Sequence, residues 1–327
     1  MQYKNIVLII LTLFIIASPG CSKRDDSVLT LKLGHALDVG HPVHKSLVFM
    51  KERLEEKSGG KVKLDIYPSE QLGSEKELVM QLQMGALDIT KVSTSPLEGF
   101  IPIYSVFSLP YLFRDEAHYW NALNGPVGKE LLLAGESKNL RGLCYYDAGS
   151  RSFYTKDKPV LSPEDLIGMK IRVMSSNTAI QMMKELGASS VAISFGELYT
   201  SLQQGVVDGA ENNPPSFCSS SHFEVCKYYS LDEHTRIPDI ILISTKTWNR
   251  LSPEIQQMIQ EAADESQEYQ KKLWKQVSDE DLKKVEEEGV EIFYPDKAPF
   301  REKVKKMYES YEGTPVGEII KRIDAVE

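Results

Sequence analysis

Short segments in which apolar and polar residues alternate are separated by longer segments with an apolar residue every three or four positions. The alternation typical of strands runs through residues 29–34, 61–68 and 87–92. The helical spacing fills the two intervals between them, from His41 to Lys57 and from Ser74 to Met84. This order of strands and helices predicts a doubly wound α/β unit, in which ligands bind beyond the carboxyl ends of the strands.

The same order of elements recurs in the middle of the chain. A strand around Arg172 is followed by a helix over 178–186, a strand over 191–193, a helix over 195–204 and a short strand over 207–210. We therefore predict a second α/β domain, which the chain enters near 147–151 and leaves near 237–239. The predicted division is 27–150 plus about 239–278 for the first domain, and 151–238 plus about 279–327 for the second.

The longest helical pattern begins at Ser252 and continues to about Glu288, with a bend expected near Ser278. About 35 residues at ~1.5 Å each give a helix of about 50 Å, which exceeds one small domain. We expect this C-terminal helix to span both domains. Two α/β domains joined by two crossovers predict a hinged pair with a cleft that closes around a small ligand.

The first 21 residues have the pattern of a signal peptide of the lipoprotein type. Lys4 precedes an apolar stretch over 6–16, which is too short for a comfortable membrane span. Residues 17–21 resemble a bacterial lipoprotein cleavage box, although Ser18 stands where Leu is usual and Pro19 is uncommon there. The pattern predicts export, with Cys21 as the lipidated residue. An ordinary signal peptide cut nearby, or an uncleaved anchor, remains an alternative.

Composition and motifs argue against several classes of function. The net charge of −9 without a basic run makes nucleic acid an unexpected partner. No nucleophile elbow, P-loop or dinucleotide glycine fingerprint marks an enzyme. The pair His41 and His44 lacks a third metal ligand, so we predict neither a metal site nor a cofactor. Cys144, Cys218 and Cys226 are expected to be free and buried, the last two on one helix and too far apart to be bridged.

The most informative charge lies in the apolar strand that contains Arg172. An arginine keeps its charge, so burying one requires an anionic partner, and no acid is close to Arg172 in the sequence. Either a distant Asp or Glu pairs with it in the fold, or its planar fork holds a ligand carboxylate. Asn212 and Asn213 follow a strand end and offer both donors and acceptors, but they are also ordinary turn residues before two prolines.

Seven segments, taken together and in order, resemble one protein family. They are 56–61 (EKSGGK), 67–73 (YPSEQLG), 83–88 (QMGALD), 107–111 (FSLPY), 168–173 (GMKIRV), 197–203 (ELYTSLQ) and 207–212 (VDGAEN). The series is similar to the solute receptors of tripartite ATP-independent periplasmic (TRAP) transporters. The resemblance implies a type II-like periplasmic binding protein that captures a solute and delivers it to a membrane permease without chemistry.

The resemblance also implies site residues. In this family the position of Arg172 holds the ligand carboxylate, the position of Arg151 often adds a second donor, and that of Asn212 adds a polar contact. Ligand contacts are also implied near Glu75 and Ser93.

The identity of the ligand depends on where this chain departs from other receptors of the family. His35, His41, Glu75, Lys91 and, further on, Asp147 and Asp239 stand near the strand ends. Acidic side chains beside an anionic ligand serve as acceptors for its hydroxyl groups. Segments 144–154 and 211–215 resemble sugar-acid receptors, so we predict a hexuronate such as glucuronate or galacturonate. For His41, Glu75 and Asp239, rim or helix-capping roles are equally open. The alternatives are another organic acid (a C4-dicarboxylate, an aldonate or sialic acid) and a receptor coupled to a sensor.

Overall fold

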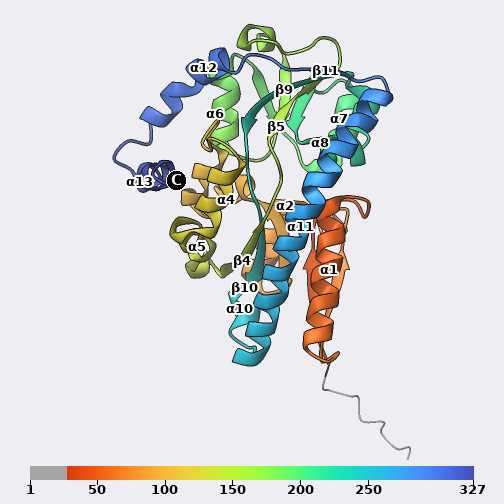
Figure 1. Cartoon of the computed structure of the whole chain (residues 1–327), viewed down its shortest axis with the longest axis vertical. Coiled ribbons are helices and arrows are strands. Elements are labelled where there is room, and N and C mark those ends of the chain that lie inside the picture. The colour runs from red at the N-terminus through yellow and green to blue at the C-terminus, as the bar shows by residue number, and fades with distance from the viewer. Residues whose placement is uncertain (1–27) are drawn as a thin grey trace, which may run out of the picture.

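The computed structural model describes residues 28–327, which form two mixed β-sheets with helices around them (Figure 1). The first sheet has the order β2-β1-β3-β10-β4 and the second has the order β11-β9-β5-β8-β6-β7. The predicted fold class of two α/β domains is confirmed. None of the helices in the described part of the chain combines the length and apolar character needed to cross a bilayer.

Both sheets mix parallel and antiparallel neighbours. The first sheet consists of β1 (Leu29–Gly34), β2 (Val62–Tyr67), β3 (Ile89–Ser93), β4 (Leu140–Tyr146) and β10 (Asp239–Ser244). The second consists of β5 (Arg151–Thr155), β6 (Lys170–Val173), β7 (Ser189–Ala192), β8 (Gly209–Asn212), β9 (Tyr228–Thr235) and β11 (Glu291–Phe293). The antiparallel strand β10 pairs with β3 so that Asp239, at its start, lies opposite Ser93, at the end of β3.

Helices connect the strands and cover the sheets. Those beside the first sheet are α1 (Pro42–Lys57), α2 (Glu75–Met84), α3 (Thr94–Leu97), α4 (Glu116–Asn124), α5 (Pro126–Leu133) and α10 (Thr245–Trp248), with 3-10 turns η1 (Pro102–Ser108) and η2 (Glu136–Lys138). The later ones are η3 (Pro163–Leu166), α6 (Asn177–Leu186), α7 (Phe195–Gln203), α8 (Pro214–Ser219), α9 (His222–Val225), α11 (Pro253–Glu287), α12 (Ala298–Glu309) and α13 (Pro315–Asp324).

Local sequence signals explain where the first two helices begin and end. The His41 side chain accepts the backbone N–H of Val43 and so caps α1, with Pro42 in its first turn. Ser74 and Glu77 form a capping box at the start of α2, which ends at Gly85 in the left-handed conformation. Both helix starts therefore place polar side chains at the carboxyl edge of the first sheet.

Along residues 28–327 the chain passes between the sheets three times: after β4, after β9, and along α11, which leads from β10 of the first sheet to β11 of the second. At the first passage the buried Gln270 of α11 accepts the N–H of Asp147 and donates to its carbonyl, both at 2.8 Å. At the second passage Arg236 donates to both carboxylate oxygens of Asp147, at 3.2 and 3.1 Å. The first two connections are thus tied to each other and to the long helix.

Helix α11 is continuous over 35 residues. It runs beside α1 in the first domain and reaches α8 in the second (Figure 1). Lys57 of α1 pairs with Glu261 at 3.0 Å and with Glu265 at 2.7 Å, which fixes the first half of α11 to the first domain. One helix therefore contacts both domains, as predicted from its length.

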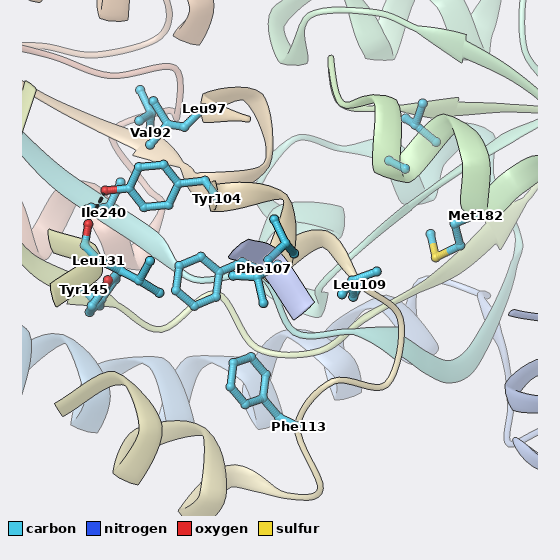
Figure 2. Packing of buried hydrophobic residues seen from close by; sticks show 14 of the residues in the cluster. Val92, Leu97, Tyr104, Phe107, Leu109, Phe113, Leu131, Tyr145, Met182 and Ile240 are labelled. Carbon is cyan, nitrogen blue, oxygen red and sulfur yellow. Dashed lines mark hydrogen bonds between the residues drawn. The ribbon is translucent and has the colours of Figure 1, made fainter. Parts of the chain in front are cut away.

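The largest apolar cluster extends across both domains. Tyr104, Phe107 and Leu109, from η1 and the segment after it, pack in the same cluster as Met182 of α6 (Figure 2). Helix α13 packs against η1 and α5 on the side of the first domain. The two domains thus share a continuous apolar core, and burial of such a core favours their remaining together.

Several local predictions differ from the structure. The strand expected over 207–210 is β8, which begins at Gly209 and continues to Asn212. Cys218 lies in α8, whereas Cys226 follows α9, because Ser221 has a positive φ of 55° and separates the two helices. The expectation of one helix for both cysteines is wrong, but all three described cysteines are free and buried.

Candidate ligand-binding site

A cavity of about 150 Å³ lies between the two domains, beyond the strand ends that face each other. All seven side chains named from the sequence line it: His41, Glu75, Ser93, Arg151, Arg172, Asn212 and Asp239. The first sheet contributes the end of β3 and the start of β10, and the second contributes β6, the end of β8 and the start of β5. The structure therefore brings together residues that are up to about 200 positions apart in the chain.

Arg172 is buried in this cavity and forms no ion pair with an acidic residue in the part of the chain that the structure describes. Its Nε donates to the carbonyl of Ile193 at 2.9 Å, and 3% of the residue is exposed. The buried Nη1 has no hydrogen-bond partner among residues 28–327, and no ion pair of Arg172 occurs there. Burial lowers the pKa of Arg172 below its usual value. A guanidinium whose two terminal nitrogens remain uncommitted presents the fork that suits a carboxylate.

Arg151 is also buried, but its guanidinium is already occupied. Its Nε pairs with the Glu211 carboxylate, Nη2 donates to Glu211 Oε1 at 2.9 Å and to the Glu211 carbonyl at 2.6 Å, and Nη1 donates to Asn212 Oδ1 at 2.7 Å. Burial alone would lower the pKa of Arg151, but the neighbouring Glu211 carboxylate has the larger effect and raises it above its usual value. After these contacts within residues 28–327, one N–H of Arg151, on Nη1, remains for a further acceptor.

The ion pair of Arg151 continues into a buried histidine. His234 Nε2 lies 3.6 Å from Glu211 Oε2, and its Nδ1 lies 2.8 Å from Asp232 Oδ2. Burial opposes the charged imidazole, yet the Asp232 and Glu211 carboxylates raise the pKa of His234 to about 9. Burial also opposes the Glu211 carboxylate, but Arg151 and His234 lower its pKa to about 2. This network holds Arg151 in place within its own domain.

Asn212 turns a donor group toward the cavity. Its Oδ1 accepts from Arg151 Nη1 at 2.7 Å and from the backbone N–H of Asn213 at 2.9 Å. Because both bonds require an oxygen at that position, they fix the orientation of the amide and leave the NH₂ group for another acceptor. Asn213 instead caps α8 by accepting the N–H of Ser216. The turn interpretation thus holds for Asn213.

The opposite wall of the cavity carries two carboxylates and one ammonium. Lys91 Nζ lies 2.8 Å from Asp239 Oδ2 and 3.5 Å from Glu75 Oε1, and Lys91 is buried. Burial opposes the charge of Lys91, but the two carboxylates raise its pKa. The backbone N–H of Ser93 also donates to Glu75 Oε1, at 3.0 Å. Two carboxylates share one ammonium, so this wall has an excess of acceptors and of negative charge.

His41 contacts the second domain directly. Its Nδ1 accepts the Val43 N–H, so Nε2 carries the proton and donates to Ser216 Oγ at 3.2 Å. Burial and the charge of Lys91 lower the pKa of His41 well below its usual value, which keeps the imidazole neutral. The capping role left open for His41 is present, and the same ring also lines the cavity and faces Trp274 at 5.8 Å.

Several lining residues were not selected from the sequence. They include Glu70, Ser216 and Trp274, and Lys91, which was noted near a strand end, was not chosen as a ligand contact. Trp274 lies in the middle of the long helix, where its aromatic character fits a core position equally well. Glu70 lies in a turn, where an acid is ordinary. Only the proximity of Glu70 to the strand end at Tyr67 could have indicated a site role.

Comparison with known proteins agrees with this architecture. A family model described as bacterial extracellular solute-binding protein, family 7 (DctP), matches residues 33–314. The chain belongs to this family. The family comprises periplasmic solute-binding proteins of transport systems rather than enzymes, which confirms the prediction of a TRAP solute-binding receptor.

Individual relatives share most of the receptor's length. YiiZ of Salmonella typhimurium, described as uncharacterized, is 44% identical over 87% of this chain and 88% of its own. A TRAP solute-binding protein from Xanthobacter autotrophicus, solved with β-D-galacturonate, is 38% identical, with a TM-score of 0.88 over 91% of this chain and 100% of that chain. One from Anaerococcus prevotii, solved with α/β D-glucuronate, is 40% identical, with a TM-score of 0.87 over 90% of this chain and 98% of that chain.

Proposed function

We propose that this receptor captures a hexuronate, D-glucuronate or D-galacturonate, through a carboxylate bound to Arg172. The observation that carries the proposal is the buried guanidinium of Arg172, which has no acidic partner among residues 28–327. A buried charge without a partner is costly, and a ligand carboxylate removes that cost by forming two parallel hydrogen bonds. The uronates bound to the Xanthobacter and Anaerococcus proteins support this class of ligand.

The opposite wall favours a hydroxylated acid over a dicarboxylate. Glu75 and Asp239 share the single ammonium of Lys91, which leaves acceptor oxygens and surplus negative charge there. Hydroxyl groups donate to such oxygens, whereas a second carboxylate on the ligand would be repelled by them. A sugar acid meets both requirements, because its carboxylate faces Arg172 while its hydroxyls face the first domain.

The remaining cavity residues complete the binding site in this proposal. The NH₂ group of Asn212 and the free N–H of Arg151 donate to the ligand carboxylate or to ring oxygens. Ser93 contributes from the end of β3, and His41 links the domains through Ser216. Domain closure excludes water from the Arg172 ion pair, which strengthens that pair.

The proposal includes delivery of the ligand to a TRAP permease and attachment of the receptor to the membrane through lipidated Cys21. Membership of the solute-binding family supports delivery to a permease. The signal peptide and Cys21 lie outside the described residues, so lipidation rests on the sequence pattern alone. Mass analysis of the mature protein would test it: a diacylglyceryl group on Cys21 supports the anchor, whereas a plain N-terminus contradicts it.

Thermal unfolding of residues 27–327 against a panel of acids tests the ligand class. The panel comprises hexuronates, aldonates, C4-dicarboxylates, sialic acid and neutral sugars. A ligand at 100 times its Kd adds about 2.7 kcal/mol of stability, which shifts the Tm measurably. We expect hexuronates to shift the Tm most. A larger shift with a dicarboxylate would contradict the hexuronate proposal, and no shift with any acid would contradict the role of Arg172.

A further inference from the structure

Glu70 occupies an unusual position at the edge of the cavity. It follows β2 in a turn and has a positive φ of 56°, which a non-glycine residue rarely adopts. Its backbone N–H donates to the carbonyl of His35 at 3.2 Å, which ties the turn to the end of β1. The backbone is therefore fixed in a conformation that directs the side chain of Glu70 to the cavity, which it lines.

The Glu70 side chain extends from the first domain to the second. A Cβ atom added to Gly196 would lie 2.5 Å from Glu70 Oε2, so only a glycine at 196 allows this approach. Gly196 is the second residue of α7, a helix of nine residues. Burial raises the pKa of Glu70, while the backbone N–H of Gly196 favours its charged form. One carboxylate oxygen thus contacts the start of a helix in the opposite domain.

The other oxygen has no donor. Glu70 Oε1 is buried and accepts no hydrogen bond from residues 28–327. Arg172 Nη1 is likewise buried, and it is a donor that has no acceptor among the same residues. Glu70 and Arg172 line the same cavity. Glu75 differs from Glu70 because its Oε1 already accepts from Ser93 and lies near Lys91. A ligand that satisfies both unpaired groups must present an acceptor to Arg172 and a donor to Glu70.

We propose that Glu70 is a specificity-determining residue whose Oε1 accepts a hydroxyl group of the ligand in the closed receptor. Because Oε2 contacts Gly196 at the same time, recognition of that hydroxyl depends on domain closure. An acid without a hydroxyl in this place leaves a buried carboxylate oxygen unpaired and binds more weakly for that reason. The inference rests on the proposed capture of a hydroxylated acid, and it adds the residue that reads one of the hydroxyls.

Replacement of one acceptor oxygen tests the inference. Glu70→Gln keeps the shape of the side chain but leaves it with one acceptor oxygen. Two are needed, one for the backbone N–H of Gly196 and one for the ligand hydroxyl. Its matched control is Glu197→Gln. Glu197 directly follows Gly196 in the sequence, its carboxylate is exposed, and it does not line the cavity. The Kd values for D-glucuronate, D-galacturonate and their monodeoxy analogues are measured by calorimetry. We expect Glu70→Gln to weaken hexuronate binding by 10- to 100-fold and Glu197→Gln to change it less than about twofold.

The deoxy analogues identify the hydroxyl. The analogue that lacks the recognised hydroxyl should bind the wild-type receptor more weakly than the parent acid does. The Glu70→Gln variant should bind this analogue and the parent acid equally well, because it has already lost the contact between Glu70 and the hydroxyl. Gly196→Ala should give the same pattern, since a Cβ displaces the Glu70 carboxylate and the φ of Gly196 is an ordinary one. If no analogue couples to either variant, or if hexuronates bind Glu70→Gln like wild type, the inference is wrong. If wild type binds no hydroxylated acid, the proposed function is wrong instead.

Discussion

Arg151 and Arg172 are both buried in one cavity wall, yet their surroundings differ in one decisive respect. Arg151 is held by Glu211 and Asn212, whereas the one hydrogen bond that Arg172 makes within the described part of the chain is to the carbonyl of Ile193. Their pKa values consequently move in opposite directions, upward for Arg151 and downward for Arg172. Burial of an arginine therefore does not define its role. The charge available to a ligand is the one that the fold leaves unpaired.

The largest expected effect is the loss of folding stability when the paired arginine, Arg151, is removed. Arg151→Ala leaves the buried Glu211 carboxylate without its main partner, which costs about 3–5 kcal/mol in unfolding free energy. Chemical denaturation of the ligand-free receptor measures this. Adding Glu211→Gln to Arg151→Ala removes the uncompensated charge and should recover part of the loss. A ligand-free Arg151→Ala receptor as stable as wild type would contradict the structural role of this arginine.

The second expected effect is a pH dependence of the unfolding free energy, which arises from His234 in the Arg151 network. The pKa of His234 is about 9 in the fold and about 6.5 when unfolded, so protonation of His234 stabilises the fold. The contribution, roughly 3 kcal/mol, is fully present below pH 6.5 and is lost as the pH rises through 9. His35 and His222, each with a pKa of about 3, stay neutral throughout this window. Unfolding free energies between pH 6 and 10 check this.

Replacement of the histidine provides the control for that pH dependence. His234→Gln should be less stable than wild type near pH 6 and should show a flatter profile up to pH 9. An unchanged slope in His234→Gln would assign the dependence to other groups.

A smaller effect is expected for the donor of Asn212. Asn212→Asp keeps an oxygen for Arg151 and Asn213 but replaces the NH₂ donor by a second acceptor. We expect hexuronate binding to weaken about tenfold or more, because a donor is lost and a negative charge faces the anion. Stability should change little, as the bonds to Oδ1 remain. Calorimetric binding together with denaturation separates the two quantities, and unweakened binding would exclude a ligand contact.

Much of the fold could be predicted because its local signals agree with each other. The capped helix starts at His41 and Ser74 follow directly from residue type and spacing. The continuous helix α11 follows from its long periodic pattern. The start of β8 and the break between Cys218 and Cys226 could not be predicted, because a two-residue shift in a short strand and a positive φ at Ser221 leave no clear periodic signal.

The sequence selected seven side chains that line the cavity, but it could not show how those side chains pair with one another. The strand-end positions and the family resemblance placed all seven named side chains at the cavity. Which arginine is paired depends on contacts across 60 residues, as between Arg151 and Glu211, and sequence spacing does not contain them. The contribution of Glu70 depends on the approach of Gly196 from the opposite domain, which no local pattern records.

The most direct test of the account is the hexuronate affinity of Arg172→Ala, measured by calorimetry beside the unfolding free energy of the same ligand-free variant. Truncating one partner of a buried charge pair costs roughly 2–5 kcal/mol, so we expect a loss of affinity of about 30-fold or more. We also expect the ligand-free variant to be at least as stable as wild type, because a buried charge without an ion-pair partner is removed. Arg172→Lys should recover little of the affinity, since lysine lacks the fork. Wild-type affinity in Arg172→Ala would contradict the account.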